Sequence, residues 1–284
     1  KGNGYKPYAR TINFLESRVD ENGKFYPNAL WDEWQKIKNH KNSTSSSNWT
    51  PLGPFDVPII PSNNKKRGNG RVNCIEFHPT DPDIFWIGSP GGGLWGTTDG
   101  GNTWTTNTDN LPVLGVSDII IDPTNTDIMY LATGDADGGD TYSIGVLKSV
   151  NGGLTWDTTG LSYSVNQEIE ISKLEMNPNN TDSIFAATGD NIFITADGGI
   201  SWTPVGPNGR WRDIHYKPEN TNILYATKQT SGTSNVYRSL DGGDTWQACD
   251  NGVSGGGKRR PLVAVTPANS EVVYSLFSDA VWGF

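Results

Sequence analysis

The sequence predicts an all-β fold, a β-propeller of four-stranded antiparallel blades. A short motif, TTDGGNTW at 97–104, recurs as SVNGGLTW at 149–156, TADGGISW at 195–202 and SLDGGDTW at 239–246. This motif, called the box below, recurs after 52, 46 and 44 residues, which is the period of one four-stranded blade. The 34 glycines, 17 prolines and 11 tryptophans are typical of many short strands joined by tight turns. An open β-sandwich would not explain the period.

Each unit is predicted to contain four strands. The second strand follows a polar turn, as in DIMYLATG, the third leads into the box, as in GVLKS, and the fourth follows the box tryptophan, as in SWTPVG. Strands that are apolar on both faces, such as DIIID, fit blades packed between neighbours, and a closed ring of blades removes exposed sheet edges. The first strand ends at a proline, as in RVNCIEFHP at 71–79, VSDIIIDP at 116–123, ISKLEMNP at 171–178, WRDIHYKP at 211–218 and PLVAVTP at 261–267.

The repeat units also predict the extent of the propeller, which we place at 48–284. Four full blades occupy about 70–252 and a partial fifth blade occupies 258–284. The stretch NWTPLGP at 48–54 nearly duplicates SWTPVGP at 201–207 without a box before it, so we expect an orphan outer strand that completes the last blade. These pieces do not close into a ring, and we therefore expect the chain to be part of a longer polypeptide with at least six or seven blades.

Residues 1–47 differ from the rest of the chain. The segment PNALWDEWQKIKNH places Leu30, Trp34 and Ile37 on one helical face, and the serine-rich KNSTSSS after it is typical of a linker. We expect a helical arm packed on the propeller. A separate partner-binding module is the alternative.

Charge and composition exclude several classes of function. Lys and Arg number 22 against 31 Asp and Glu, giving a net charge of −9, which argues against nucleic acid or an anionic membrane as partner. No stretch approaches the roughly 18 apolar residues of a membrane span, so no membrane insertion is expected. Cys74 and Cys249 fall at different places in different units, so no disulfide is expected. Motifs for metalloproteases, phosphate loops and nucleophile elbows are missing, and we expect no cofactor apart from the calcium candidate described below.

The box itself is interpreted as a structural turn. Asp or Asn can accept hydrogen bonds from the backbone of its own turn, and the glycines allow positive φ. The Ser or Thr four residues after the acid can join the network, and the Trp can anchor the turn on the blade. Asn151 replaces Asp in the second copy, which a catalytic carboxylate or calcium ligand would not tolerate. The structural residues of the four boxes are Asp99, Trp104, Asn151, Trp156, Asp197, Trp202, Asp241 and Trp246.

The pattern S/T-x-D-x-G-x-x-S/T-W in these boxes resembles the Asp-box, or BNR-type repeat, of sialidases, sortilin-type receptors and two-propeller xyloglucanases. The resemblance covers roughly 49–284 and implies a propeller in which the boxes lie away from the active site. The order WTPLGP, GRVN, PGGGLW, DIMYLATGD and YSIGVLKS further resembles large exported Asp-box proteins of Bacteroidota, many of which carry a type IX sorting domain. That resemblance implies an extracellular or outer cell-surface location.

Strand direction assigns the turns to two faces of the propeller. The boxes and the turns between first and second strands share face two, whereas face one carries the turns between second and third strands and the links between blades. We therefore expect the ligand on face one, opposite the boxes. Arg71, Arg210 and Arg259 each lie eight residues before the proline of a first strand, and three guanidiniums there could bind a carboxylate or sulfate. Solvated loop charge is the alternative.

Two more groups on face one are candidate sites. The loop GDADGGD at 134–140 holds Asp135, Asp137 and Asp140, which resemble an oxygen-ligand Ca²⁺ loop but lack its distal Glu; a polar turn is the alternative. In SPGGGLW, the backbone could approach a ligand closely and Trp95 could offer a stacking surface. An ordinary blade-core position is the alternative for Trp95.

The segment GRVNCIEFHPTDPDIFWIGSPGGGLW resembles the matching region of the xyloglucanases. Those enzymes place a catalytic Asp directly before the stretch that matches Gly91–Gly93, and Pro90 at that position can neither donate nor accept a proton. A glycosidase needs two suitably separated carboxyls, and the second would come from a second propeller. The three arginines are similar to the carboxylate-binding triad of sialidases, but no Tyr–Glu nucleophile pair can be assigned.

These observations predict a secreted or cell-surface propeller that binds or scaffolds a protein or glycan and is non-catalytic in this segment. Secretion or surface-attachment machinery is a further expected partner. The alternative is a glycoside hydrolase-like enzyme, of the xyloglucanase or sialidase kind, whose catalytic carboxyls lie outside this segment.

Overall fold

The structure is a computed structural model of the chain, which describes Lys36 and residues 70–230, 234–249 and 259–278. The predicted arm and linker at 1–47, apart from Lys36, lie outside the described residues, as do the predicted orphan strand at 48–54 and the C-terminal segment 279–284. The described helices include none long and apolar enough to cross a membrane.

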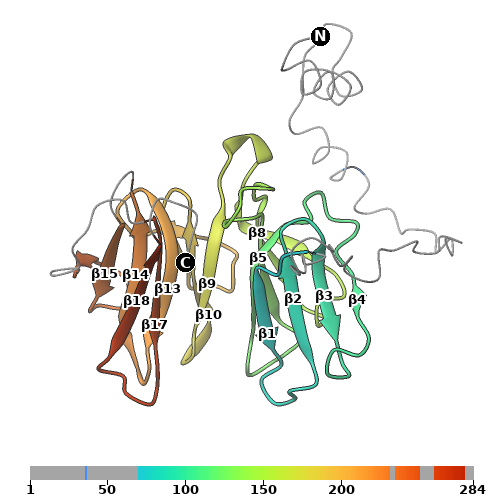
Figure 1. Cartoon of the computed structure of the whole chain (residues 1–284), viewed down its shortest axis with the longest axis horizontal. Helices are drawn as coiled ribbons and strands as arrows, with labels where there is room; N and C mark the ends of the chain where they lie inside the picture. Colours follow the sequence, from blue (N-terminus) through green and yellow to red (C-terminus); the bar gives the residue numbers. More distant parts are fainter. Residues whose placement is uncertain (1–35, 37–69, 231–233, 250–258, 279–284) are drawn as a thin grey trace, which may run out of the picture.

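Four four-stranded antiparallel sheets and a fifth pair of strands follow one another along the chain (Figure 1). Consecutive strands pair within each sheet, so every sheet is a meander, as the repeat predicts. A 3₁₀ turn, η1 (Val165–Gln167), lies between the second and third sheets. The blades are β1 (Cys74–Phe77), β2 (Phe85–Ser89), β3 (Gly93–Thr97) and β4 (Thr105–Thr106); β5 (Val116–Ile121), β6 (Met129–Thr133), β7 (Gly145–Ser149) and β8 (Asp157–Ser162); β9 (Ile171–Asn177), β10 (Asn180–Thr188), β11 (Ile192–Thr195) and β12 (Thr203–Pro204); β13 (Arg210–Lys217), β14 (Asn220–Gln229), β15 (Ser234–Ser239) and β16 (Gln247–Ala248); and β17 (Arg259–Val265) with β18 (Val273–Ser278).

The core lies between neighbouring blades. All six residues of β5 are buried, as expected for a strand whose two faces both meet another sheet. The innermost strands contact one another in succession, from β1 to β5, β9, β13 and β17. Separate apolar clusters fill the three spaces between the first four blades, and the one between the third and fourth is centred on Phe185 and Trp211. The predicted all-β propeller architecture is therefore confirmed.

Carboxylates also connect one innermost strand to the next. The backbone N–H of Leu174 on β9 donates to Asp118 of β5 at 2.8 Å, and the N–H of Val263 on β17 donates to Asp213 of β13 at 3.0 Å. Asp118 and Asp213 each lie five residues before the proline that ends their first strand. The same contact therefore recurs at two interfaces between blades. A buried backbone donor without a partner would cost about 1–3 kcal/mol, and these bonds remove that cost.

The box turns form the predicted network. The hydroxyl of Thr97 donates to Asp99 at 2.8 Å, and Asp99 also accepts from the backbone N–H of Thr103 at 2.8 Å and from its hydroxyl at 2.6 Å. Gly100 and Gly101 have φ of 68° and 89°, a region that favours glycine. The same bonds recur around Asp197 and Asp241.

Asn151 forms the same turn, but its side chain donates to the Thr155 hydroxyl, whereas in the other boxes the hydroxyl donates to the carboxylate. Its amide oxygen accepts from Ser149 at 2.9 Å and from the N–H of Thr155 at 2.9 Å, while its amide nitrogen donates to the Thr155 hydroxyl at 2.8 Å. An amide thus serves where the other boxes use a carboxylate. The turn requires a short side chain with an acceptor, not a negative charge.

Each box also contacts the turn between the first two strands of its own blade. The first glycine donates its N–H to that turn in all four blades, from Gly100 to Asp83, Gly152 to Asp127, Gly198 to Asp182 and Gly242 to Asn222, at 2.8–3.0 Å. Boxes and these turns therefore share one face, as strand direction predicts. The indole N–H of Trp104 and of Trp202 donates to the second box glycine, whereas the indole nitrogens of Trp156 and Trp246 are buried without a partner.

Asp197 allows the turn to be tested. Asp197→Asn should leave the thermal unfolding midpoint at neutral pH nearly unchanged because Asn151 already fills the same position, whereas Asp197→Ala should lower it by removing three hydrogen bonds. The bonds from Ser201, then Thr195, lower the pKa of Asp197 from 3.8 to about 2. Its contribution is therefore present above pH 3.8 and is lost as the pH falls towards 2.

Calorimetric scans between pH 2 and 7 would measure this. In Asp197→Asn the loss of stability below pH 3.8 should be smaller than in the unmodified chain, with Asn151→Asp as the reciprocal control. Equal midpoints for Asp197→Ala and Asp197→Asn would contradict the structural role of the turn.

Candidate functional site

The candidate site on face one begins with the acidic loop, residues 134–140, which joins β6 to β7. Asp135 organises this loop because its carboxylate accepts the backbone N–H groups of Asp137, Gly138 and Asp140 at 3.0–3.2 Å. The Asp135 side chain is fully buried. Burial alone would raise its pKa, but the N–H donors and the guanidinium of Arg71 outweigh burial and lower it. Asp135 is therefore an ionised carboxylate buried within its own loop.

Arg71, one of the predicted ligand-binding arginines, is the counter-ion of this loop. Its guanidinium lies 2.5 Å from Asp135 and 3.5 Å from Asp140. Asn73 supports the pair, since it accepts from Arg71 at 3.1 Å and donates to Asp135 at 3.2 Å. The first blade is thus tied to the second by charge-assisted hydrogen bonds.

Two arginines of the fourth blade reach the same loop from β13. Arg210 forms an ion pair with Glu170 and donates to the carbonyl of Ala136 at 3.4 Å. Arg212, which is 9% exposed, donates to the same carbonyl. Burial raises the pKa of Glu170, and the charges of Arg210 and Arg212 oppose that rise. The second predicted arginine therefore has an internal carboxylate partner, and Arg212 was missed by the sequence analysis.

On β17 the side chain of Arg260, the neighbour of the predicted Arg259, reaches the loop. Arg260 forms an ion pair with the Asp137 carboxylate and also donates to the Asp137 carbonyl. The strand is irregular here, with a register shift between Arg259 and Pro261 and a φ of 49° at Arg260. Counting back from the proline assumed a regular strand, so it did not identify Arg260. The side chain of Arg259 lies outside the described part of the chain.

The calcium candidate and the arginine candidate are therefore partners of each other. Asp135, Asp137 and Asp140 each form an ion pair with an arginine, and among the described residues no group of three or more acidic, His or Cys side chains could hold a metal ion. The geometry thus does not support the metal hypothesis, and the polar-turn alternative describes the loop. We call Arg71, Arg210, Arg212 and Arg260 the arginine cluster.

Trp95 lies on β3 and is 36% exposed, so it is not the buried core residue of the alternative prediction. Its indole N–H donates to the carbonyl of Gly92 at 2.7 Å, which fixes the glycine turn. The described cleft does not include Trp95 in its lining.

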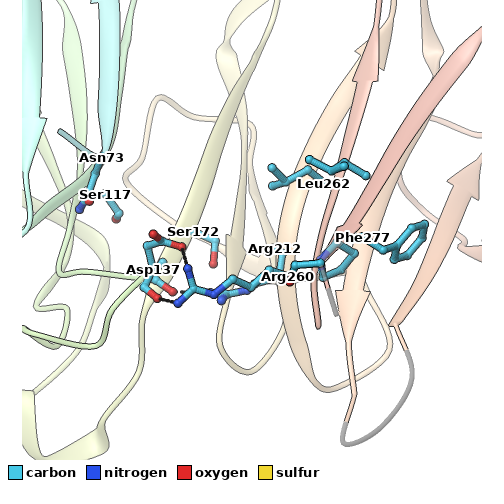
Figure 2. Close-up of a pocket in the computed structure, with 12 residues that line it drawn as sticks. Asn73, Ser117, Asp137, Ser172, Arg212, Arg260, Leu262 and Phe277 are labelled. Atoms are coloured by element: carbon cyan, nitrogen blue, oxygen red, sulfur yellow. Dashed lines mark hydrogen bonds and ion pairs between the residues drawn. The ribbon is translucent and has the colours of Figure 1, made fainter. Parts of the chain in front are cut away.

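Next to the acidic loop is a cleft of about 680 Å³ that faces the innermost strands. Figure 2 shows Asp137 and Arg260 joined across it, with Ser172 and Arg212 beside them and Leu262 and Phe277 on the side of the fifth blade. One wall is polar and the other apolar. In four of the five first strands, the residue six positions before the terminal proline is polar, namely Asn73, Ser117, Ser172 and Arg212. This pattern could have revealed the polar wall from sequence.

Pro90 and the carboxylates near the cleft are engaged in contacts within the protein. Pro90 offers only its carbonyl, which accepts from the hydroxyl of Thr141 at 3.0 Å. The four described carboxylates around the arginine cluster are all ion-paired, including Glu170, whose pKa burial raises.

Further ion pairs, called the strand ion pairs below, connect the innermost strands β5, β9 and β13. Lys173 lies 3.2 Å from Asp118, whose charge raises the lysine pKa. His215 lies 3.2 Å from Asp213 and 3.5 Å from Glu175. Burial lowers the pKa of His215, but the hydrogen bonds and charges of these two carboxylates outweigh it and raise the pKa to about 9. His215 is therefore protonated at neutral pH and joins the third blade to the fourth.

The strand ion pairs of His215 predict a loss of folding stability in mild alkali. Because the folded-state pKa of His215 lies above its usual 6.5, its contribution is complete below pH 6.5 and is lost as the pH rises through about 9. The difference corresponds to at most about 3 kcal/mol. Urea unfolding at pH 6 and pH 9.5 should show this drop in the unmodified chain and a smaller one in His215→Gln; an equal drop in both would refute the assignment.

Loss of Arg71 should destabilise the chain because the buried Asp135 would keep its charge without a counter-ion. We expect Arg71→Met to cost about 1–3 kcal/mol, less than for a fully buried pair, since the Arg71 side chain is 39% exposed. Asp135→Asn in the same chain should recover part of that cost. Additive effects of the two substitutions in a double-mutant cycle would show that the pair contributes nothing of its own.

No family model matches the chain. A xyloglucanase of a Paenibacillus species is 25% identical over 216 residues, which is 64% of this chain and 21% of that enzyme. An ancestral GH74 enzyme superposes with a TM-score of 0.59 at 20% identity, covering 68% of this chain and 27% of the other. The GH74 enzyme of Niastella koreensis gives a TM-score of 0.57 at 23% identity, covering 75% and 34%. The chain thus spans a minor part of each relative, and it shares their β-propeller fold.

Proposed function

We propose that this propeller is a glycan-binding module that holds its ligand on face one and does not itself hydrolyse it. The observation that carries the proposal is the ion pairing of every carboxylate around the cleft, together with Pro90 where xyloglucanases resemble this segment but place an acid. A cleft of about 680 Å³ with one polar and one apolar wall remains available for a ligand.

The choice of a glycan over a protein ligand rests on the relatives. The curated protein that the chain resembles at 25% identity is a xyloglucanase, and the structural neighbours described above are GH74 enzymes. A propeller that has lost a catalytic carboxyl can retain affinity for the same polymer, because sugar binding and proton transfer use different side chains. A xyloglucan-type glycan is therefore the first ligand to test.

A second candidate is an enzyme of the xyloglucanase kind, of which this chain is one part. It is favoured by the partial coverage, since the matched region makes up 21% of the Paenibacillus enzyme. Parts of the enzyme outside this segment would then supply both catalytic carboxyls, and face one would position substrate.

We also propose that the protein works outside the cell or on its outer surface, as the xyloglucanase relatives and the Bacteroidota-type resemblance of the sequence suggest. The four turns with Asp-box hydrogen bonding support a relationship to Asp-box proteins. Export by a type IX route, with surface-attachment machinery as partner, rests on the sequence resemblance alone.

A glycan array followed by calorimetry on the full-length protein would test the proposal. We expect binding of xyloglucan oligosaccharides and no release of reducing sugar above background. Turnover would instead establish the enzyme, and binding to proteins with no glycan bound would replace the ligand class.

A further inference from the structure

Four described carboxylates, Asp135, Asp137, Asp140 and Glu170, form ion pairs with the arginine cluster, but none of them pairs with Arg212. Three of its guanidiniums form ion pairs inside the described part of the chain, as Arg71 with Asp135, Arg210 with Glu170 and Arg260 with Asp137. Arg212 forms no ion pair with a described carboxylate. Its hydrogen bond goes to the carbonyl of Ala136, which is neutral.

Arg212 is nevertheless deeply buried and lines the cleft. It is 9% exposed, and burial, with the like charge of Arg210, lowers its pKa to about 10. A guanidinium has five N–H donors, and a buried charge is expected to be paired and hydrogen-bonded. Arg212 therefore has donors to offer to an anion in the cleft.

The hydroxyl of Ser172 is a second unused group in the same wall. Its oxygen is buried without a hydrogen-bond partner. At the equivalent position of the two preceding units, Asn73 donates to the carbonyl of Val116 and Ser117 to that of Ile171, which ties each strand to the next. Ser172 makes no such bond, so its hydroxyl is free for a ligand.

We propose that Arg212 and Ser172 form a subsite for one carboxylate, and that this carboxylate belongs to an acidic sugar residue of the bound glycan. The inference rests on the proposed function and adds the ligand's charge to it. The guanidinium would bind the carboxylate through two parallel hydrogen bonds, with the Ser172 hydroxyl donating a third.

The opposite wall favours a sugar ring as the carrier of the acid. Leu262, Leu276 and Phe277 line the cleft on the side of the partial fifth blade, and the C–H face of a sugar can pack against these apolar side chains. One guanidinium without a direct ion pair, in a chain of net charge −9, favours an isolated uronate over a polyuronate, which long-range repulsion would oppose.

Isothermal titration of the full chain with two disaccharides, one ending in glucuronate and its counterpart ending in glucose, tests the subsite. The glucuronate compound should bind at least about tenfold more tightly. Arg212→Met should remove that preference, a loss of about tenfold to a hundredfold, and Ser172→Ala should weaken acid binding by about threefold. Arg238→Met, a charge removal on β15 outside the cleft lining, is the matched control and should change neither affinity.

Folding of the variants can be separated from binding. Arg212→Met could disturb the acidic loop through Ala136, whereas Ser172→Ala removes a hydroxyl without a partner and Arg212→Lys keeps the charge without the planar fork. Thermal unfolding of each variant is measured first. A folded Ser172→Ala and Arg212→Lys that both bind the acid as tightly as the unmodified chain would overturn the subsite.

Other results are equally decisive. Equal affinity for the acidic and neutral disaccharides would overturn the proposal, as would binding of N-acetylleucine, but not its amide, in place of glucuronate, which would indicate a peptide carboxylate. A neutral xyloglucan oligosaccharide distinguishes this inference from the proposed function. If it binds the unmodified chain and Arg212→Met alike while the acid shows no preference, the glycan-binding function stands and the acidic subsite fails.

Discussion

The hydrogen bonds that pass from each innermost strand to the next are the interaction on which the arrangement of the blades depends. Apolar packing between blades is strong but lacks direction, and it would permit neighbouring sheets to slide. Asp118 and Asp213 accept backbone N–H groups of the following blade at fixed positions, so they set the register between blades. This register in turn brings Arg71, Arg210 and Arg260 to one loop on face one.

At the acidic loop, the aspartates of one predicted site form ion pairs with the arginines of the other. An arginine triad indicates an anion site and an aspartate-rich glycine loop indicates a cation site when each is considered alone. Placed together, they neutralise each other, because the buried carboxylate of Asp135 is more stable beside Arg71 than it would be alone. Arg212 is the arginine of the cluster that forms no ion pair with a described carboxylate, and it lines the cleft.

The ion pairing of the described carboxylates around the arginine cluster also bears on the comparison with xyloglucanases. A propeller can keep a binding cleft while losing catalysis, since shape depends on the blades and proton transfer on one or two carboxyls. In this chain Pro90 lies beside the acidic loop, where the Thr141 hydroxyl uses its carbonyl. This hydrogen bond joins the first blade, at Pro90, to the second blade, at Thr141.

The sequence by itself determined the blade period, the order of strands and the face that carries the boxes, because these depend on local patterns: alternating apolar residues, prolines at strand ends and glycine turns. Asn151 in a box was enough to identify a turn. Tertiary structure alone decided the pairing of Arg71 with Asp135, 64 positions apart, and the pairing of Arg260 with Asp137. Charges that meet across blades, and a strand irregularity that redirects one side chain, depend on packing between units that no local pattern encodes.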